Sequence, residues 1–496
     1  PLTRLPDYCP PAFRPSSPRT TMSFARILRS SAIMGGAQVV TLATAFIRTK
    51  VVAQLMGPAG VGLAGILTAF NGNVSTLAAW GLGTSGVRLI ASAPPGQTAC
   101  TQAAVRKFGT TLTWLGFWAT VLLFLPVSYL TFGTGQYALE LLIGGMAVPC
   151  IIANSIWGSI LQAAGHVKSL AKGQTLSALI GLFLGLPSIY FFGSVGIAIS
   201  LLLAAATPMA FSWYVASKDC PSTGADALSS DLRALFNMGG GLMIVGLAAQ
   251  ISAYFVRFII IKNHGTDLAA GLADAGYYQA AIAIAGSLPA LVFSAMGTDF
   301  FPRVAAAKDE AEAKTLSEKQ IEAGLLLALP IFTGLLTMNR LGIRILYADK
   351  FDAALPLLDW MIWGVFLRLL AWPLGYWMLA RGGPRTVVIV ELGSNLMMAI
   401  LPLILIPSYG LVGAAMAFFI GNLVYAAIMI VVAQKRSRRW LSLRTLGFFI
   451  SAGIVLALTQ ALSRLAPGMY WGAIPTALVT AGCAWIYLKA LDGQND

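Results

Sequence analysis

Apolar segments of about 20 residues recur along the whole chain, and each is long enough to cross roughly 30 Å of hydrocarbon as a helix. Fourteen can be distinguished, at about 28–52, 60–87, 108–131, 138–163, 170–191, 194–215, 235–261, 276–298, 321–345, 354–379, 386–406, 410–433, 445–465 and 470–490. Backbone groups in lipid must be hydrogen-bonded internally, which leaves helices or a closed barrel. Uninterrupted apolar runs lack the alternation of barrel strands. The sequence therefore predicts an all-α polytopic membrane protein.

Composition and charge support this class of protein and exclude others. The chain is 57% hydrophobic and 10% charged, whereas a soluble domain carries roughly 25% charged residues. A net charge of +14 would suggest nucleic acid in a soluble protein. In a membrane protein it reflects the excess of Lys and Arg in cytoplasmic loops. No nucleic-acid partner is expected.

The distribution of cations predicts the orientation of the chain. An even number of segments places both termini on one side, and from residue 26 on most Lys and Arg residues fall on that side. The other side holds only Arg48, Lys50, Arg257, Lys262, Arg340, Arg344, Lys350 and Arg464. Because cations accumulate in cytoplasmic loops, both termini are expected in the cytoplasm.

An internal repeat predicts the domain organisation. GSVGIA at 193–198 recurs as GLVGAA 217 residues later, and GHVKSLAKGQTLS at 165–177 aligns with GPRTVVIVELGS at the same offset. AGVGLAGI at 59–66 resembles AGYYQAAI at 275–282. The offset spans six helices, so the two halves are parallel repeats.

The repeat divides the chain into two lobes and flanking parts. Residues 22–217 are expected to form an N-lobe, 218–231 a cytoplasmic linker and 232–433 a C-lobe, while 434–496 add a basic loop and two further helices. The Pro-rich stretch 1–21 is expected to be a disordered tail, and it is consistent with sequence upstream of a start at Met22.

Cations within the apolar segments are the candidate binding residues. Arg368 lies near the middle of the tenth segment, where a charge costs about 2.5–3.5 kcal/mol on insertion scales and normally faces the bundle interior or a wet cavity. Arg48 and Arg257 lie near the outer ends of segments one and seven, where snorkelling to the interface is the alternative. Lys50 extends the first of these ends. Arg88 ends the second segment, where the cytoplasmic bias also explains it.

Other polar residues leave alternatives open. Asp299 and Glu391 are the carboxylates nearest the inner half of the membrane, and either an ion pair with arginine or proton or sodium coupling fits them. Trp372 and Tyr376 share a helix face with Arg368 and fit sugar stacking or packing. Gln38, Asn71 and Asn73 fit helix–helix hydrogen bonds or cavity lining. Gln250 shares a face with Arg257.

Several kinds of chemistry lack their motifs. The sequence has no GxxxxGK[ST] phosphate loop, no HExxH, and no Cys/His spacing for a metal. It also has no constellation for covalent catalysis. The expectation is a transporter that needs no metal or cofactor, and not an enzyme. Arginine binds phosphate oxygens and stays charged in any environment, so the cations favour an anionic cargo.

The stretches GPAGVGLAG, YFVRFIIIK…AGYYQAAIA, DKFDAALPLLDWMIWGVFLRLLAWPLGYWMLA and PRTVVIVELGS resemble Wzx-type flippases. These are the O-antigen and enterobacterial common antigen translocases of the multidrug/oligosaccharidyl-lipid/polysaccharide exporter superfamily. The resemblance covers about 23–436. It implies a bacterial inner-membrane flippase with a basic cavity between two six-helix lobes, and it assigns cargo binding most directly to Arg257, Lys50 and Arg368. Many family members have twelve helices, so the pair at 443–490 departs from the pattern.

The resemblance implies an undecaprenyl-pyrophosphate-linked oligosaccharide as cargo, moved by alternating access and in contact with membrane lipid. A glycan polymerase and a chain-length regulator are possible partners. Two alternatives stay open at this point: an ion-coupled multidrug exporter of the same superfamily, and a membrane-embedded glycan polymerase or ligase. The short outer loops argue against the enzyme, because such enzymes usually carry a large periplasmic loop.

Overall fold

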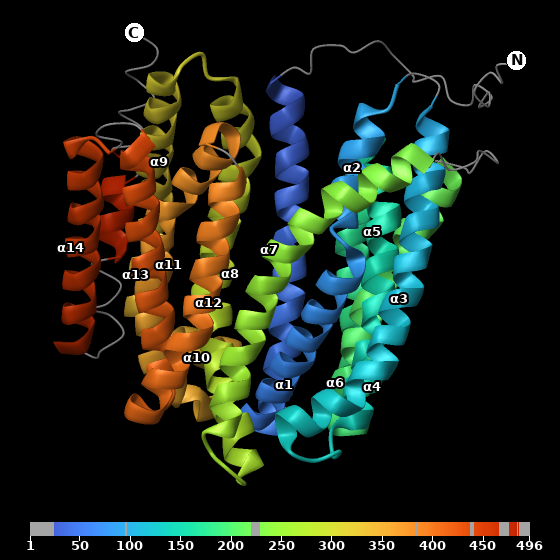
Figure 1. Ribbon diagram of the computed structural model, residues 1–496. Coiled ribbons are helices and arrows are strands. Elements are labelled where there is room, and N and C mark those ends of the chain that lie inside the picture. Colours follow the sequence, from blue (N-terminus) through green and yellow to red (C-terminus); the bar gives the residue numbers. More distant parts are fainter. Residues whose placement is uncertain are drawn as a thin grey trace, which may run out of the picture. The chain divides into compact units, whose positions relative to one another are not determined.

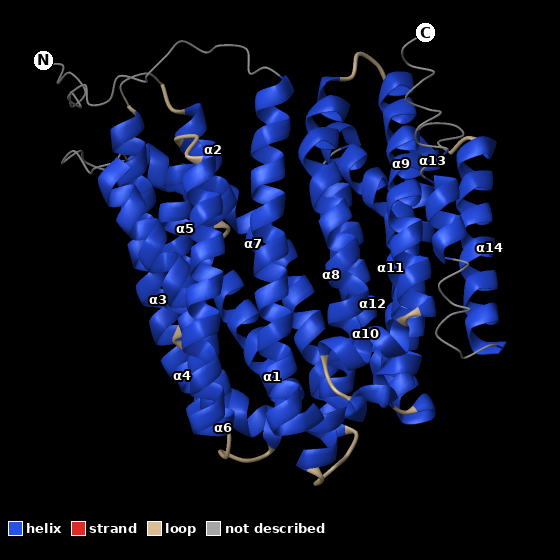
Figure 2. Ribbon diagram, turned by 180° about the vertical axis from the view of Figure 1, so that it is seen from behind, coloured by secondary structure: helices blue, strands red, loops and turns tan. Residues whose placement is uncertain are grey.

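The computed structural model describes residues 24–94, 97–219, 229–382, 384–436, 441–465, 476–483 and 485. Within these residues every regular element is a helix and no strand is present (Figure 2). Eleven helices are long and apolar enough to cross a membrane. The structure therefore confirms an all-α, multi-pass membrane protein.

The helices group into two compact units. Unit 1 contains the described residues up to Met56 together with Leu63–Tyr254, and unit 2 contains Gly57–Gly62 and the described residues from Phe255 on. The boundaries between the units thus fall inside two helices, one at Gly57–Gly62 in the helix that ends at Ala79 and the other in the helix that ends at Lys262. The expected lobes, 22–217 and 232–433, stay a prediction.

Figure 1 traces the helices in chain order. Those that begin in unit 1 are α1 (Phe24–Ala79), α2 (Leu82–Ser92), α3 (Thr98–Phe132), α4 (Ala138–Gly145), α5 (Ala147–Ala163), α6 (Val167–Asp219) and α7 (Ser229–Lys262). Those of unit 2 are α8 (Leu268–Ala306), α9 (Glu310–Thr337), α10 (Asn339–Leu346), the 3-10 helix η1 (Asp349–Ala354), α11 (Leu355–Trp377), the π-helix η2 (Met378–Gly382), α12 (Pro384–Tyr409), α13 (Leu411–Arg436) and α14 (Leu443–Leu465).

The eleven apolar helices contain thirteen of the fourteen expected segments. Helices α1 and α6 each contain two of them, with a break at Gly57 (φ 68°) in α1 and at Gly193 (φ 55°) in α6. Glycine adopts such positive φ angles without a steric penalty. The fourteenth segment, 470–490, lies mostly outside the described residues. The count of fourteen therefore stays a prediction.

The repeat that the sequence predicts has a structural counterpart in two hairpins. After Gly193, α6 folds back, and a Cβ on Gly196 would lie 1.9 Å from the carbonyl oxygen of Ser188. The turn between α12 and α13 does the same 217 residues later, with Gly410 at φ 62° and Gly413 against the carbonyl oxygen of Leu405. Both hairpins therefore have the same register and need glycine at the same two places.

Three expected segments are interrupted: 60–87, 138–163 at Met146 and 321–345 at Met338. The segment predicted at 60–87 stops at Ala79, and Trp80 and Gly81 both adopt positive φ angles before α2 begins. The Trp80 indole donates a hydrogen bond to the carbonyl oxygen of Phe236, at 2.8 Å. Its backbone lies so close to Gly239 that a Cβ there would be 2.0 Å from the Trp80 carbonyl oxygen. This contact with the first part of α7 fixes the interruption.

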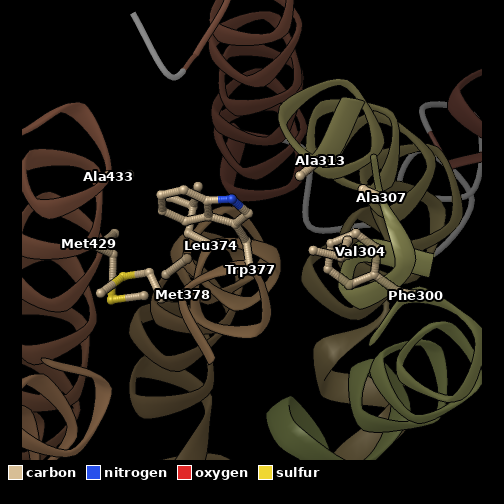
Figure 3. Close-up of a cluster of buried hydrophobic side chains, with 11 residues drawn as sticks. Phe300, Val304, Ala307, Ala313, Leu374, Trp377, Met378, Met429 and Ala433 are labelled. Carbon is tan, nitrogen blue, oxygen red and sulfur yellow. The ribbon is translucent and has the colours of Figure 1, made fainter. Parts of the chain in front are cut away.

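In unit 2, α11 is the most buried membrane helix. The C-terminal end of α11 contributes Leu374 and Trp377 to a core that also contains Phe300 of α8 and Met429 of α13. Figure 3 shows the Trp377 indole beside Leu374, with Phe300 and Val304 on one side and Met429 on the other. Aromatic and aliphatic side chains of this size dominate the energy of a packed core.

Helix α14 attaches to unit 2 through polar contacts near both of its ends. Thr445 donates to Glu322 of α9 at 3.1 Å, and Arg464 pairs with Asp359 of α11 at 3.0 Å. In Figure 1 it lies at the edge of the unit beside α9. Helix α14 contains the thirteenth expected segment, 445–465, and the additional pair beyond two six-helix lobes stays a prediction.

Candidate functional site

Arg257 lies near the end of α7, five residues before Lys262, and its side chain is half-buried. Its Nε and Nη2 both donate to the Oε1 atom of Gln279 on α8, at 3.2 and 2.6 Å. The guanidinium also lies over the ring of Tyr278, with 5.7 Å between Cζ and the ring centroid. Two neighbouring residues of α8 thus hold this cation in one orientation.

The hairpin between α7 and α8 makes this contact possible. A Cβ on Gly271 would lie 2.9 Å from the carbonyl oxygen of Ile261, so glycine lets the two helices approach closely. His264 and Asp274 join the same hairpin at 2.7 Å. A tight, cross-linked hairpin keeps the partner residues of Arg257 fixed.

Arg368 lies in the middle of α11. Every residue from Leu357 to Trp377 is buried or half-buried except Arg368, which is exposed. A charged side chain at membrane depth is costly unless it meets a counter-charge or water. The structure therefore places this cation at the least covered point of the most buried helix.

A hydrogen-bonded pair, Tyr425 and Glu391, lies within electrostatic reach of Arg368 through the tyrosine. Tyr425 on α13 donates a 2.6 Å hydrogen bond to Oε1 of Glu391 on α12. The charge of Arg368 acts on the same tyrosine hydroxyl. Helices α12 and α13 thus bring an acid and a phenol together, within electrostatic reach of the cation on α11. The expected pairing of Glu391 with an arginine stays a prediction.

The aromatic residues near Arg368 pack against other rings. Trp372 stacks with Phe293 and Phe300 of α8, with ring centroids 5.7 and 6.1 Å apart. Its contact with Tyr376 is closer, at 4.5 Å. Because Trp372 and Tyr376 pack against the core of unit 2, the geometry favours packing over sugar stacking for both.

The remaining predicted cations lie elsewhere. Arg48 and Lys50 are half-buried on α1 in unit 1, nine and seven residues before the break at Gly57. Arg88 is exposed on the short helix α2, whose buried residues are Leu82, Ser85, Gly86 and Ile90. Within unit 2 the structure brings Arg257 together with Gln279, and Glu391 together with Tyr425. The cargo-binding roles of all five cations stay predictions.

Several polar residues of α1 and α7 make helix–helix contacts within unit 1. Asn71 donates to the carbonyl oxygen of Gly144 at 2.9 Å, and Asn73 donates to that of Gln250 at 3.2 Å. The Gln250 side chain packs on Gly72. Gln250 therefore belongs to unit 1, while Arg257 belongs to unit 2, and the shared helix face predicted for these two residues is divided between the units.

The carboxylate predicted at Asp299 has its backbone in α8, but its side chain lies outside the described residues. No group of His, Cys, Asp or Glu residues that fits a metal ion occurs in the part of the chain that the structure describes.

Sequence reasoning did not single out Gln279 or Tyr425. A polar residue in an apolar segment was the available signal for Gln279, since GYYQAAI is otherwise apolar or small. For Tyr425 the only signal was a tyrosine inside LVYAAIMIVV. Neither signal names a partner on another helix.

Comparison with curated proteins gives relatives of low identity and wide coverage. A putative O-antigen transporter of Shigella flexneri is 23% identical over 312 residues, which cover 62% of this chain and 72% of the relative. The lipid III flippase of Escherichia coli K12 is 22% identical over 408 residues, covering 76% of this chain and 91% of the relative.

Solved structures share the fold. A lipid II flippase, MurJ, in an inward closed conformation gives a TM-score of 0.69 at 14% identity, covering 94% of this chain and 99% of the other. An inward-facing multidrug resistance transporter of the MATE family and MOP superfamily gives 0.62 at 16% identity, covering 82% and 98%.

The family assignment follows from residues 27–308, which match the family described as "Polysaccharide biosynthesis protein". This range is more than half of the chain and contains most of unit 1, the whole of α7 and α8, and the Arg257–Gln279 contact. The chain belongs to the polysaccharide biosynthesis protein family.

Proposed function

We propose that this protein is a flippase that moves a polyprenyl-pyrophosphate-linked oligosaccharide across the bacterial inner membrane by alternating access. The observation that carries the proposal is Arg368, an exposed cation in the middle of the most buried membrane helix. Such a residue is a functional-site hypothesis by default. The relatives named as an O-antigen transporter and a lipid III flippase support transport of a lipid-linked cargo.

The charge of the site fits a diphosphate. Arg257 and Arg368 are cations on membrane-spanning helices of unit 2, and arginine recognises phosphate oxygens through its planar fork of N–H donors. Arg48, Lys50 and Arg88 are the further cations assigned to the path of the cargo. The expected topology, with both termini in the cytoplasm, lets a cytoplasmic lipid reach the outer leaflet when the two lobes rock.

Glu391 is the coupling carboxylate of this proposal. It accepts a hydrogen bond from Tyr425, whose hydroxyl Arg368 also affects. When ionised, it offsets the positive charge that attracts the cargo. Binding of a proton or a sodium ion to Glu391 restores that charge, which links ion binding to cargo binding. Asp299 is a second candidate for this role, and a glycan polymerase and a chain-length regulator are the partners expected downstream.

The first experiment removes the charge of Arg368. In a bacterium whose own gene is deleted, Arg368→Ala is expected to abolish surface glycan while the protein still reaches the membrane. Lys350→Ala is the matched control, because Lys350 is an exposed cation on η1, which precedes the membrane helix α11. Wild-type glycan with Arg368→Ala would contradict the assignment.

A second readout separates cargo classes. Overexpression of a multidrug exporter lowers the sensitivity of the cell to drugs without changing its surface glycan. The proposed flippase is expected to restore glycan to the deletion strain and to leave drug sensitivity unchanged. The opposite pair of results would replace the lipid-linked cargo with a drug.

A further inference from the structure

The partner of Arg257 differs in charge from the partners of other arginines. Arginines that form ion pairs with carboxylates include Arg340 with Asp352, Arg344 with Asp349, Arg444 with Glu322 and Arg464 with Asp359. Arg257 is held by Gln279, whose side-chain amide is neutral.

This difference matters for binding an anion. A carboxylate beside a guanidinium cancels most of the field that a second anion would feel. An amide oxygen accepts the same N–H donors and fixes the orientation of the guanidinium, but it adds no negative charge. The Gln279 contact therefore positions Arg257 without itself adding a negative charge.

The surroundings of the contact are rigid. Tyr278 is 5% exposed, and the Arg257 guanidinium lies over its uncharged ring. One turn before Gln279 on α8, a Cβ on Gly276 would lie 1.9 Å from the carbonyl oxygen of Pro58, so this helix is also tightly packed against the segment Gly57–Gly62. A side chain held in this way loses little freedom when it binds a ligand.

We propose that Gln279 is the positioning and specificity-determining residue of an anion site at Arg257, and that the ligand of this site is a diphosphate ester. The inference rests on the proposed function, because the diphosphate is the anionic group of that cargo. A neutral residue at position 279 selects for an anion, and an acidic residue there excludes it.

A purely structural role for Arg257 predicts the opposite preference. Glutamate has almost the shape of glutamine and accepts the same hydrogen bonds, and it adds an attraction to the guanidinium. If Arg257 only ties α7 to α8, Gln279→Glu strengthens the hairpin and costs no transport. If Arg257 binds an anion, the same substitution keeps the hairpin and removes the binding.

The experiment measures binding and stability on the purified full-length protein in detergent micelles. The probe is geranylgeranyl diphosphate, a short polyprenyl diphosphate. Gln279→Glu is expected to weaken its binding at least tenfold, with a melting temperature equal to or above that of the wild type. Unchanged binding with a raised melting temperature would overturn the inference in favour of the structural role.

Gln460→Glu is the matched control. Gln460 on α14 is also half-buried, and its Oε1 atom accepts a 2.9 Å hydrogen bond from Trp363. The substitution adds the same carboxylate to a membrane helix of the same unit but away from Arg257. It is expected to leave binding of the probe within twofold of the wild type. A loss equal to that of Gln279→Glu would mean that any added acid weakens binding, which contradicts a site-specific effect.

A double variant tests whether Gln279 acts through Arg257. Gln279→Leu removes the acceptor of both hydrogen bonds from Arg257 without adding charge and is expected to weaken binding about threefold to tenfold. In an Arg257→Ala background the same change is expected to have no further effect, because the group it positions is gone. An equal loss in both backgrounds would show that Gln279 contacts the ligand independently.

Failure of this inference and failure of the proposed function give different results. If the wild type neither restores surface glycan nor binds the probe, the proposed function is wrong and the inference falls with it. If the wild type does both and Gln279→Glu behaves like the wild type, the function stands and the role of Gln279 is wrong.

Discussion

Arg257 and Arg368 are both arginines on membrane-spanning helices of unit 2, but their surroundings differ. Arg257 is half-buried and held by the neutral Gln279. Arg368 is exposed and lies within electrostatic reach of Tyr425, whose hydroxyl donates a hydrogen bond to the acid Glu391. The contact with Gln279 fixes the orientation of the Arg257 guanidinium and adds no negative charge. The Arg368 side chain is more exposed, and the carboxylate of Glu391 is hydrogen-bonded to the tyrosine that Arg368 influences.

The difference suggests two roles within one proposed cargo path. A cation with a neutral partner attracts an anion under all conditions. A cation beside a carboxylate attracts it strongly only when the carboxylate is neutralised by a proton or an ion. We therefore assign permanent binding to Arg257 and coupled binding to Arg368, and four predictions test this division.

The largest effect is expected from removing either cation. Arg257→Ala and Arg368→Ala should each lower binding of geranylgeranyl diphosphate about a hundredfold, which corresponds to about 2.7 kcal/mol. Loss of a charged hydrogen-bonding partner commonly costs this much. Binding to purified protein provides the measurement, and Lys350→Ala is the control. A loss confined to one of the two variants would remove the other arginine from the site.

The next largest effect is expected from disturbing the packing of α8, the helix that carries the partner residues of Arg257. Gly276→Ala places a Cβ against the backbone of Pro58, and overpacking of this kind typically costs about 1–3 kcal/mol. Thermal unfolding should show the loss, and Arg257-dependent binding should fall with it. Gly286→Ala is the control, since a Cβ there meets nothing within 4 Å. Equal stability of the two variants would contradict the tight packing of α8.

A smaller effect of opposite sign is expected at Glu391. Glu391→Gln removes the negative charge near Arg368 and should raise binding of the diphosphate about threefold to tenfold at neutral pH. Transport should no longer respond to an imposed proton or sodium gradient in vesicles. Gln279→Glu, which adds a negative charge beside Arg257, should instead lower binding of the diphosphate. If Glu391→Gln leaves both diphosphate binding and the gradient response of transport unchanged, Glu391 does not link ion binding to cargo binding.

The smallest effect is expected from Tyr425→Phe, which removes one hydrogen bond to Glu391 and keeps the ring. A hydrogen bond to a charged group is worth about 1.5–3 kcal/mol, but the half-buried Glu391 can regain part of this from water. A twofold to fivefold change in the gradient response is therefore expected, with binding at Arg257 unaffected. Transport assays in vesicles give the measurement. If Tyr425→Phe reduced the gradient response more than Glu391→Gln did, Tyr425 and not Glu391 would be the principal coupling residue.

Much of the fold was predictable because its causes are local. The length of an apolar run determines whether a helix can cross a membrane, and a glycine at a fixed offset marks where a hairpin turns. The repeat was visible in GSVGIA and GLVGAA, and the structure has the same turn at Gly193 and Gly410. The interruption at Trp80 was not predictable, because it depends on a contact with Gly239, which lies far away in the sequence.

The candidate site was predictable only in part. The sequence by itself determined the class of protein and the identity of the cations in its membrane helices, because hydropathy and charge belong to single residues and short runs. Only the tertiary structure decided the partners: that Arg257 meets an amide, that Glu391 meets Tyr425 near Arg368, and that Gln250 packs apart from Arg257. Helical periodicity defines which residues share a face of one helix, but the distance between two helices depends on close contacts such as the one at Gly271, and these arise when the whole unit packs.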